Sequence, residues 1–156
     1  MKEAEKIKLE ITQKFNLNSD LIIIQNPKRI WLEVDEAIFS DIFDYLVKQH
    51  KFSILCTITG LDEITSFGFI YHLANENGLV INLKFKQAKD QPIKTIIAYF
   101  PGAEIYEREI FDLLGVKVSG LPEGKRYPLP DDWPTGQYPL RKDWKEETLE
   151  KEQKNA

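Results

Sequence analysis

Five of the eight prolines of this chain fall within residues 121–139, and this stretch constrains the fold more than any other. Proline lacks an amide hydrogen and fixes its backbone angle, so a stretch this rich in it excludes a helix or a central β-strand. The stretch also carries more aromatic surface than a solvated linker would expose, in Tyr127, Trp133 and Tyr138. We therefore predict an extended arm that lies on a partner, with proline lowering the ordering cost of docking.

The residues before the arm show helix and strand periodicities in alternation. Apolar residues spaced three or four apart predict helices over 2–15 and roughly 36–50. Apolar alternation and short apolar runs predict strands over 21–25, 29–34, 52–60, 65–73 and 79–85. An Asn77-Gly78 turn should join the last two strands as a hairpin. This order predicts an α+β domain, with helices packed on one face of a mixed or antiparallel sheet.

A further short helix is predicted over 103–114, because Gly115 stands where a left-handed C-terminal cap is expected. The apolar run 93–100 before it is ambiguous between helix and strand. Charge pairs one helical turn apart are expected for Glu104 with Arg108 and for Arg108 with Asp112. The predicted parts are an α+β domain over 1–100, a motif helix over 101–116 and a partner-binding arm over 117–144. Residues 145–156 are predicted to form a charged tail that is either a frayed helix or disordered.

Composition excludes several classes of function. The net charge of −4 argues against a nucleic-acid partner. With one cysteine and two histidines, the chain cannot by itself hold an iron–sulfur cluster, and no metal or other cofactor site is expected. Cys56 is expected to be a small buried residue in a strand. The abundance of Lys, Glu and Ile is typical of a thermophile.

Neither a membrane span nor a signal sequence is apparent. No apolar run approaches the ~20 residues that cross a bilayer, and the first residues are charged. We therefore expect a cytoplasmic chain that reaches the membrane only through partner subunits.

The densest ionic cluster is Glu107-Arg108-Glu109 with Asp112, which could serve as an acid–base pair or as metal ligands. Residues two apart on a helix diverge by about 200°, so the two glutamates cannot converge on one substrate. Arg108 between them favours ionised carboxylates. The cluster therefore indicates ion pairs that fix neighbouring loops or a partner, and no catalytic residue is assigned.

Two basic doublets lie on the arm, Lys125-Arg126 and Arg141-Lys142. Each could hold a phosphate or acidic residues of another subunit, but each alone is typical of solvated surface charge. The chain contains no glycine-rich phosphate loop, CxxC pair or nucleophile elbow.

Together, the helix cluster and the end of the arm resemble a family signature. The helix reads ERE-x-x-D-x-x-G over 107–115 and the arm ends in PLRKD over 139–143. In this order and separation the two resemble the family of the C-type NADH dehydrogenase subunits, the thirty-kilodalton subunit of respiratory complex I, over 101–144. The residues that carry the resemblance are Glu107, Arg108, Glu109, Asp112, Gly115, Arg126, Asp131, Trp133, Pro139, Arg141, Lys142 and Asp143.

The resemblance implies a hydrophilic, non-catalytic subunit without a cofactor, packed beside the subunit that holds the terminal redox site. The family's Gly-His-Pro is Gly120-Leu121-Pro122 here, and residues 127–134 look like versions in membrane-bound [NiFe]-hydrogenases. We therefore expect a peripheral subunit of an ion-pumping, ferredoxin-dependent hydrogenase on the cytoplasmic side of the cell membrane. Its partners would be a catalytic large subunit and an Fe–S subunit, which carry the Ni–Fe centre and the Fe–S clusters.

Three alternatives stay open. Within the family, the parent complex could be an NADH:quinone oxidoreductase with FMN in its NADH module, or a sulfur-reducing relative. Outside it, the chain could be a free-standing interaction module that uses its arm to bind another protein. It could also be an independent enzyme built on the carboxylate cluster.

Overall fold

The computed structural model describes residues 2–146 and divides the chain into two compact units. Unit 1 comprises residues 1–59 and 68–86, and unit 2 comprises residues 60–67 and 87–156. Most of the predicted charged tail, from residue 147 onward, lies outside the described residues.

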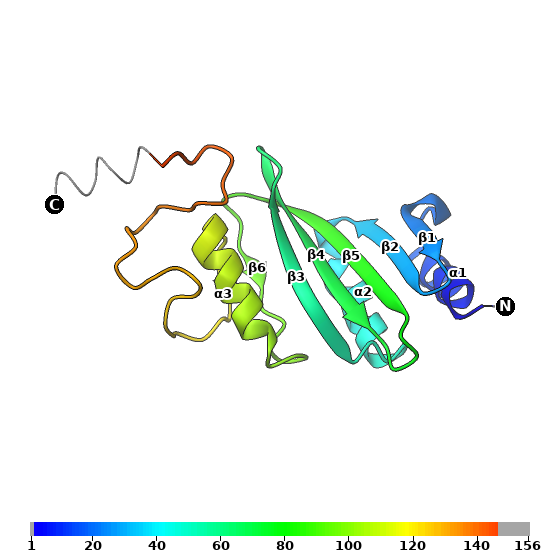
Figure 1. The fold of residues 1–156 in the computed structure, drawn as a ribbon. Helices are drawn as coiled ribbons and strands as arrows, with labels where there is room; N and C mark the ends of the chain where they lie inside the picture. Colours follow the sequence, from blue (N-terminus) through cyan, green and yellow to red (C-terminus); the bar gives the residue numbers. More distant parts are fainter. Residues whose placement is uncertain (1, 147–156) are drawn as a thin grey trace. The chain divides into compact units, whose positions relative to one another are not determined.

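Unit 1 is built on a five-stranded sheet with the strand order β1-β2-β5-β4-β3 (Figure 1). Strand β2 pairs antiparallel with β1 and parallel with β5, which confirms the mixed sheet. The strands span β1 (Ile22–Asn26), β2 (Arg29–Val34), β3 (Ile54–Asp62), β4 (Ser66–Ala74) and β5 (Val80–Ala88). The predicted hairpin is β4–β5, and Gly78 takes the positive φ of 74° that its turn requires.

Two helices, α1 (Glu3–Phe15) and α2 (Glu36–Lys48), lie on one face of this sheet, as predicted (Figure 1). The ring of Phe39 on α2 lies 4.2 Å from that of Phe85 and 5.0 Å from that of Tyr71. The ring centres of Phe15 on α1 and Tyr45 on α2 lie 5.5 Å apart, so these two side chains pack the helices against each other. Aromatic side chains bury much apolar area and prefer offset or edge-to-face packing, so these rings contribute to the stability of unit 1 together with the aliphatic core.

The opposite face of the sheet carries no described α-helix of unit 1 (Figure 1). Alternate strand residues point to opposite faces, and this face carries both polar and apolar side chains. A cross-strand row there runs through Asn82, His72 and Thr59, with His72 Nδ1 2.7 Å from Asn82 Oδ1 and His72 Nε2 3.0 Å from Thr59 Oγ1. Trp31 is the β2 neighbour of Asn82, and Ile23 is the β1 neighbour of Trp31.

Unit 2 contains the helix α3 (Ala103–Leu114), whose bounds are those predicted. The ambiguous run 93–100 becomes the two-residue strand β6 (Ile93–Lys94) followed by turns. Strand β6 pairs in parallel with β7 (Val118–Ser119), so the segments before and after α3 lie side by side.

The predicted burial of Cys56 is wrong. The residue lies in β3 as expected, but it is exposed. Strand β3 is an edge strand of the sheet. Ile54, two residues before Cys56 on this strand, is exposed as well, at 49%. An apolar run gives no information on whether a strand lies at the centre or at the edge of a sheet.

Candidate functional site

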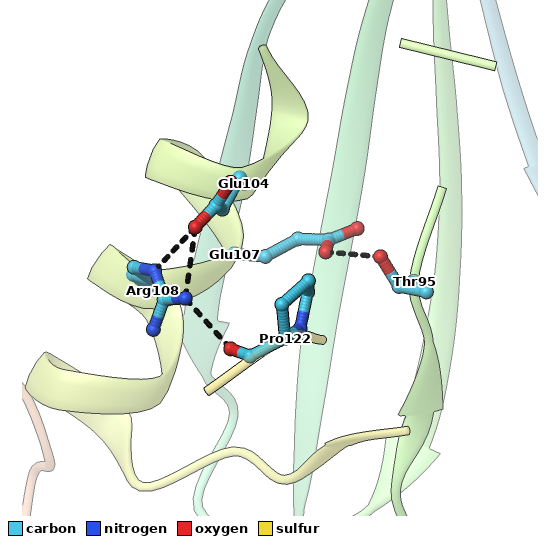
Figure 2. Close-up of polar contacts among 5 residues, drawn as sticks. All are labelled: Thr95, Glu104, Glu107, Arg108 and Pro122. Carbon is cyan, nitrogen blue, oxygen red and sulfur yellow. Dashed lines mark hydrogen bonds and ion pairs between the residues drawn. The ribbon is translucent and has the colours of Figure 1, made fainter. Parts of the chain in front are cut away.

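Glu107 lies on α3 and is completely buried. Its Oε2 accepts a hydrogen bond of 2.5 Å from the Thr95 hydroxyl, and its Oε1 accepts one of 2.7 Å from the amide of Ile96 (Figure 2). Burial raises the pKa of Glu107, and these two hydrogen bonds act in the opposite direction. The carboxyl group therefore fixes the turn after β6 against α3, through hydrogen bonds and not through the ion pair that was predicted.

Arg108, the next residue, faces the start of the arm (Figure 2). Its Nε and Nη2 donate to Glu104 Oε1 at 3.0 and 2.8 Å, which confirms the predicted pair on α3. Nη2 also donates to the carbonyl oxygen of Pro122 at 2.6 Å. A Cβ on Gly124 would collide with the guanidinium group, so any other residue at this position would displace the Arg108 side chain.

Asp112 lies one turn further along α3 and is 1% exposed. The predicted pair with Arg108 is wrong: Asp112 Oδ1 accepts from Arg126 Nε at 2.6 Å instead. Arg108 is committed to Glu104 and Pro122, whereas Asp112 accepts a second hydrogen bond from the amide of Leu129 at 2.8 Å. Arg126 completes the contact by donating to the carbonyl oxygen of Trp133 at 2.5 Å.

Gly115 ends α3 in the predicted left-handed conformation, with a φ of 72°. Arg141 donates from Nε to the carbonyl oxygen of Leu114 at 2.6 Å, and its guanidinium carbon lies 4.6 Å from the ring centre of Tyr138. A Cβ on Gly115 would come within 2.5 Å of Tyr138 and 2.7 Å of Arg141. Glycine is therefore required both by the backbone angle and by the close approach of the arm.

Asp62 holds the end of the arm through a buried carboxylate, as Asp112 holds its middle. Its side chain is 2% exposed and lies 2.7 Å from the ammonium group of Lys89. It also accepts hydrogen bonds from the amides of Ile64 and Lys142, at 2.8 and 3.0 Å. Burial alone would raise the pKa of Asp62, but these donors and the Lys89 charge lower it to about 2. Neither Asp62 nor Lys89 was predicted from the sequence, because no local pattern marks either one.

The structure corrects the solvated-charge interpretation for the arginine of each doublet, whereas Lys125 is exposed as expected. Arg126 is 22% exposed and ion-paired, and Arg141 is half-buried against the end of α3. Lys142 is exposed, and only its amide takes part in the network.

The remaining motif residues lie nearer the surface. Asp131 and Asp143 are exposed, whereas Glu109 and Pro139 are half-buried. Trp133 donates from Nε1 to the carbonyl oxygen of Gln137 at 2.8 Å. The structure therefore brings Arg108, Asp112, Gly115, Arg126 and Arg141 into contact with the arm, and Glu107 into contact with the turn after β6. We call these contacts, with those of Asp62, the network, and Glu109, Asp131 and Asp143 lie outside it.

The three buried carboxylates, Glu107, Asp112 and Asp62, each bind a backbone amide of this chain. Within residues 2–146, no three His, Cys, Asp or Glu side chains converge as ligands of a metal ion would. The network binds a chain segment that has almost no regular structure to α3. Several large apolar side chains on the same unit remain exposed: Ile64, Ile105, Phe111, Tyr127 and Leu140.

Residues 32–150 match the family model for the 30-kilodalton subunit of respiratory-chain NADH dehydrogenase, and this range includes every residue of the network. The chain belongs to this family. The match confirms the resemblance and makes the chain a member of a family of oxidoreductase-complex subunits.

Relatives from named complexes align over most of the chain. The chain is 32% identical to the C-type subunit of the F(420)H(2) dehydrogenase of Methanosarcina mazei, over 91% of this chain and 92% of the relative. It is 26% identical to the membrane-bound hydrogenase subunit beta of Pyrococcus furiosus, over 93% of this chain and 88% of the relative. These relatives are subunits of multi-subunit complexes.

The fold is also found in a solved structure. A chain of the membrane-bound sulfane sulfur reductase, an archaeal respiratory membrane complex, matches with a TM-score of 0.79 and 23% identity, over 99% of this chain and 92% of that one. No helix among residues 2–146 is long and apolar enough to cross a membrane.

Proposed function

We propose that this chain is a non-catalytic, hydrophilic accessory subunit of a complex I-like membrane-bound oxidoreductase, and that unit 2 packs against the catalytic subunit. One observation carries this proposal: four charged residues of the family motif bind the chain's own backbone, namely Glu107, Arg108, Asp112 and Arg141. A catalytic carboxylate would instead have to reach a substrate within hydrogen-bonding distance.

The network gives unit 2 a rigid surface without regular secondary structure. Charge-assisted hydrogen bonds are the strongest that side chains offer, and three separate points on the arm are held by them. The arm residues would therefore meet a partner already ordered, which lowers the entropic cost of association. Exposed Ile105 and Phe111 on α3, with Leu140 on the arm, would supply the apolar contacts.

As the parent complex we propose an ion-pumping, ferredoxin-dependent [NiFe]-hydrogenase. The alignment with the Pyrococcus furiosus hydrogenase subunit over 93% of this chain supports it, together with Leu121 at the position of the family's histidine. The Ni–Fe centre and Fe–S clusters would then belong to the large and Fe–S subunits. This chain would reach the cytoplasmic side of the membrane through them.

A second candidate parent is a coenzyme F420-dependent dehydrogenase. The higher identity to the Methanosarcina mazei subunit, 32% against 26%, favours it. An NADH:quinone oxidoreductase is a third parent of the same class, and the C-type subunit of the Moorella thermoacetica enzyme is 36% identical over 66% of this chain.

Purification of the tagged chain from its native membranes tests the proposal. The hydrogenase parent predicts a co-purifying large subunit with stoichiometric nickel, and hydrogen evolution from reduced ferredoxin. Oxidation of F(420)H(2), or an FMN-containing module that oxidises NADH, would identify the other parents.

Recovery of the chain alone from the soluble fraction would contradict all three parents and favour a free-standing interaction module. The independent-enzyme alternative requires turnover by the isolated chain that is lost in Glu107→Gln.

A further inference from the structure

A groove of about 470 Å³ opens in unit 1, where the carboxyl ends of the parallel strands β2 and β5 meet the start of β1. Its apolar lining comes from Leu21, Ile23, Trp31 and Val34. Leu21 and Ile23 are 44% and 53% exposed, so two large aliphatic side chains of this lining contact solvent. The volume lies in the range of ligand pockets, about 300–1,000 Å³.

Carboxylates outnumber basic groups around the groove. Glu33 is neutralised, because the ammonium groups of Lys84 and Lys86 lie 3.5 and 3.7 Å from its oxygens. The other three carboxylates that line the groove have no ion pair among residues 2–146: Asp20, Asp35 and Glu36. The groove is therefore an apolar surface with an unbalanced negative rim.

The Asp35 carboxylate on this rim is not used to cap the helix that follows it. It is the N-cap residue of α2, where an aspartate ordinarily accepts hydrogen bonds from the first amides of the helix. In this chain its side chain makes no such bond. Its carboxylate, together with that of Glu36 in the first turn, remains available to an incoming donor.

Trp31 adds a second means of recognising a cation. Its indole lies half-buried in the groove wall, and its indole N–H has no hydrogen-bond partner among the described residues. The face of an indole ring attracts Lys and Arg side chains, and nearby carboxylates attract the same cations independently. The indole N–H could donate to a backbone carbonyl of the same ligand.

We infer that this groove binds an extended, basic segment of a partner protein. A Lys or Arg side chain pairs with Asp35, Glu36 or Asp20 and lies over Trp31, while an adjacent aliphatic or aromatic side chain covers Leu21 and Ile23. Charge complementarity decides the class of occupant: an anionic ligand is repelled, and a second copy of this chain carries a net charge of −4. The groove belongs to unit 1, so it is a separate surface from the packing site proposed for unit 2.

Photo-crosslinking in the native cells tests the inference on the full chain. The variant Ile23→p-benzoylphenylalanine is expected to crosslink to another protein, at a segment with Lys or Arg within about three residues of the attachment point. The matched control, Leu9→p-benzoylphenylalanine, replaces an aliphatic residue of α1 that is 45% exposed and outside the groove. It is expected not to give this product.

A charge substitution provides the second arm of the test. Glu36→Lys in the crosslinking background should lower the yield about five- to tenfold, because it reverses one of three unpaired charges. Glu76→Lys, on the exposed β4–β5 turn, should leave the yield unchanged. No product above the Leu9 control, attachment to a segment without basic residues, attachment to a second copy of this chain, or a yield insensitive to Glu36→Lys would each overturn the inference. The result does not depend on which complex the chain joins, so its failure is distinguishable from that of the proposed function.

Discussion

Unit 1 and unit 2 differ in burial of carboxylates: among the described residues, the buried carboxylates belong to unit 2. In unit 1 the core is aromatic and aliphatic, and the carboxylates of the groove remain at the surface. In unit 2 three carboxylates are buried, and large apolar side chains such as Phe111 are exposed. Regular strands and helices satisfy their own backbone groups, whereas an irregular arm needs side chains to do so. Where a chain lacks secondary structure, buried carboxylates can take over this role and leave apolar surface for a partner.

The largest effect on folding is expected in unit 1, from Phe43→Ala. Phe43 is 2% exposed and its ring lies 5.7 Å from that of Tyr71, so the substitution leaves a cavity between α2 and the sheet. The free energy of unfolding should fall by about 3–5 kcal/mol in urea titrations. The control Phe111→Ala removes the same ring from an exposed position of unit 2 and should change stability by less than about 0.5 kcal/mol. Similar losses for both variants would contradict the contrast between the units.

Asp112→Asn tests the buried carboxylates of unit 2. The substitution removes the ion pair with Arg126 and weakens the hydrogen bond from Leu129, which should cost about 2–3 kcal/mol. Hydrogen exchange should accelerate at residues 126–133 more than in the strands of unit 1. The control Asp132→Asn alters an exposed aspartate of the arm and should have no such effect. Unchanged exchange in Asp112→Asn would show that the arm is held by other contacts.

Gly115→Ala should cost about 1–2 kcal/mol, because the left-handed conformation disfavours a side chain and Tyr138 and Arg141 must move. Gly136→Ala separates these two causes. Gly136 also has a positive φ, of 83°, but a Cβ there meets no atom within 4 Å. Its cost in thermal unfolding should therefore be the smaller of the two, and equal costs would mean that the arm does not press on Gly115.

The smallest effect is a pH dependence at Glu107. Burial raises the pKa of Glu107 in the folded state above its ordinary 4.5. The contribution of protonated Glu107 to the free energy of unfolding is therefore fully present below pH 4.5 and is lost as the pH rises through the pKa of the folded state. The Glu107→Gln variant keeps an oxygen that can accept the hydrogen bond from the Ile96 amide, but its side chain cannot ionise. The stability of this variant relative to the wild type should thus increase as pH rises from 4.5.

Asp62→Asn provides the opposite sign in the same pH series. The pKa of Asp62 is lowered to about 2 from 3.8, so its contribution is present above pH 3.8 and is lost as pH falls through about 2. Asp62→Asn should therefore be destabilised at neutral pH and approach the wild type in strong acid. Parallel pH profiles for the two variants would contradict the assignment of these carboxylates.

Elements with strong local signals were predictable from the sequence. Helix α3 lies between Pro101-Gly102 and Gly115, and its bounds and cap are as predicted, as are the bounds of β2. The motif residues were found through the family resemblance, but of their contacts only the pair of Arg108 with Glu104 was predicted. The pairing of Asp112 with Arg126 spans an irregular loop, so helical spacing could only suggest the nearer Arg108. Asp62, Lys89 and the groove at Trp31 depend on how distant strands and loops meet, which no local pattern records.

The exposed apolar residues of unit 2, fixed in place by the inward carboxylates, are expected to hold this chain in its complex. The double variant Ile105→Ser with Phe111→Ser removes two of these residues from α3 without touching the network. We expect the tagged variant to fold as the wild type does but to recover at least tenfold less catalytic large subunit from native membranes. The control Leu9→Ser, an exposed residue of α1 in unit 1, should recover it fully. Full recovery with the double variant would contradict the role proposed for unit 2.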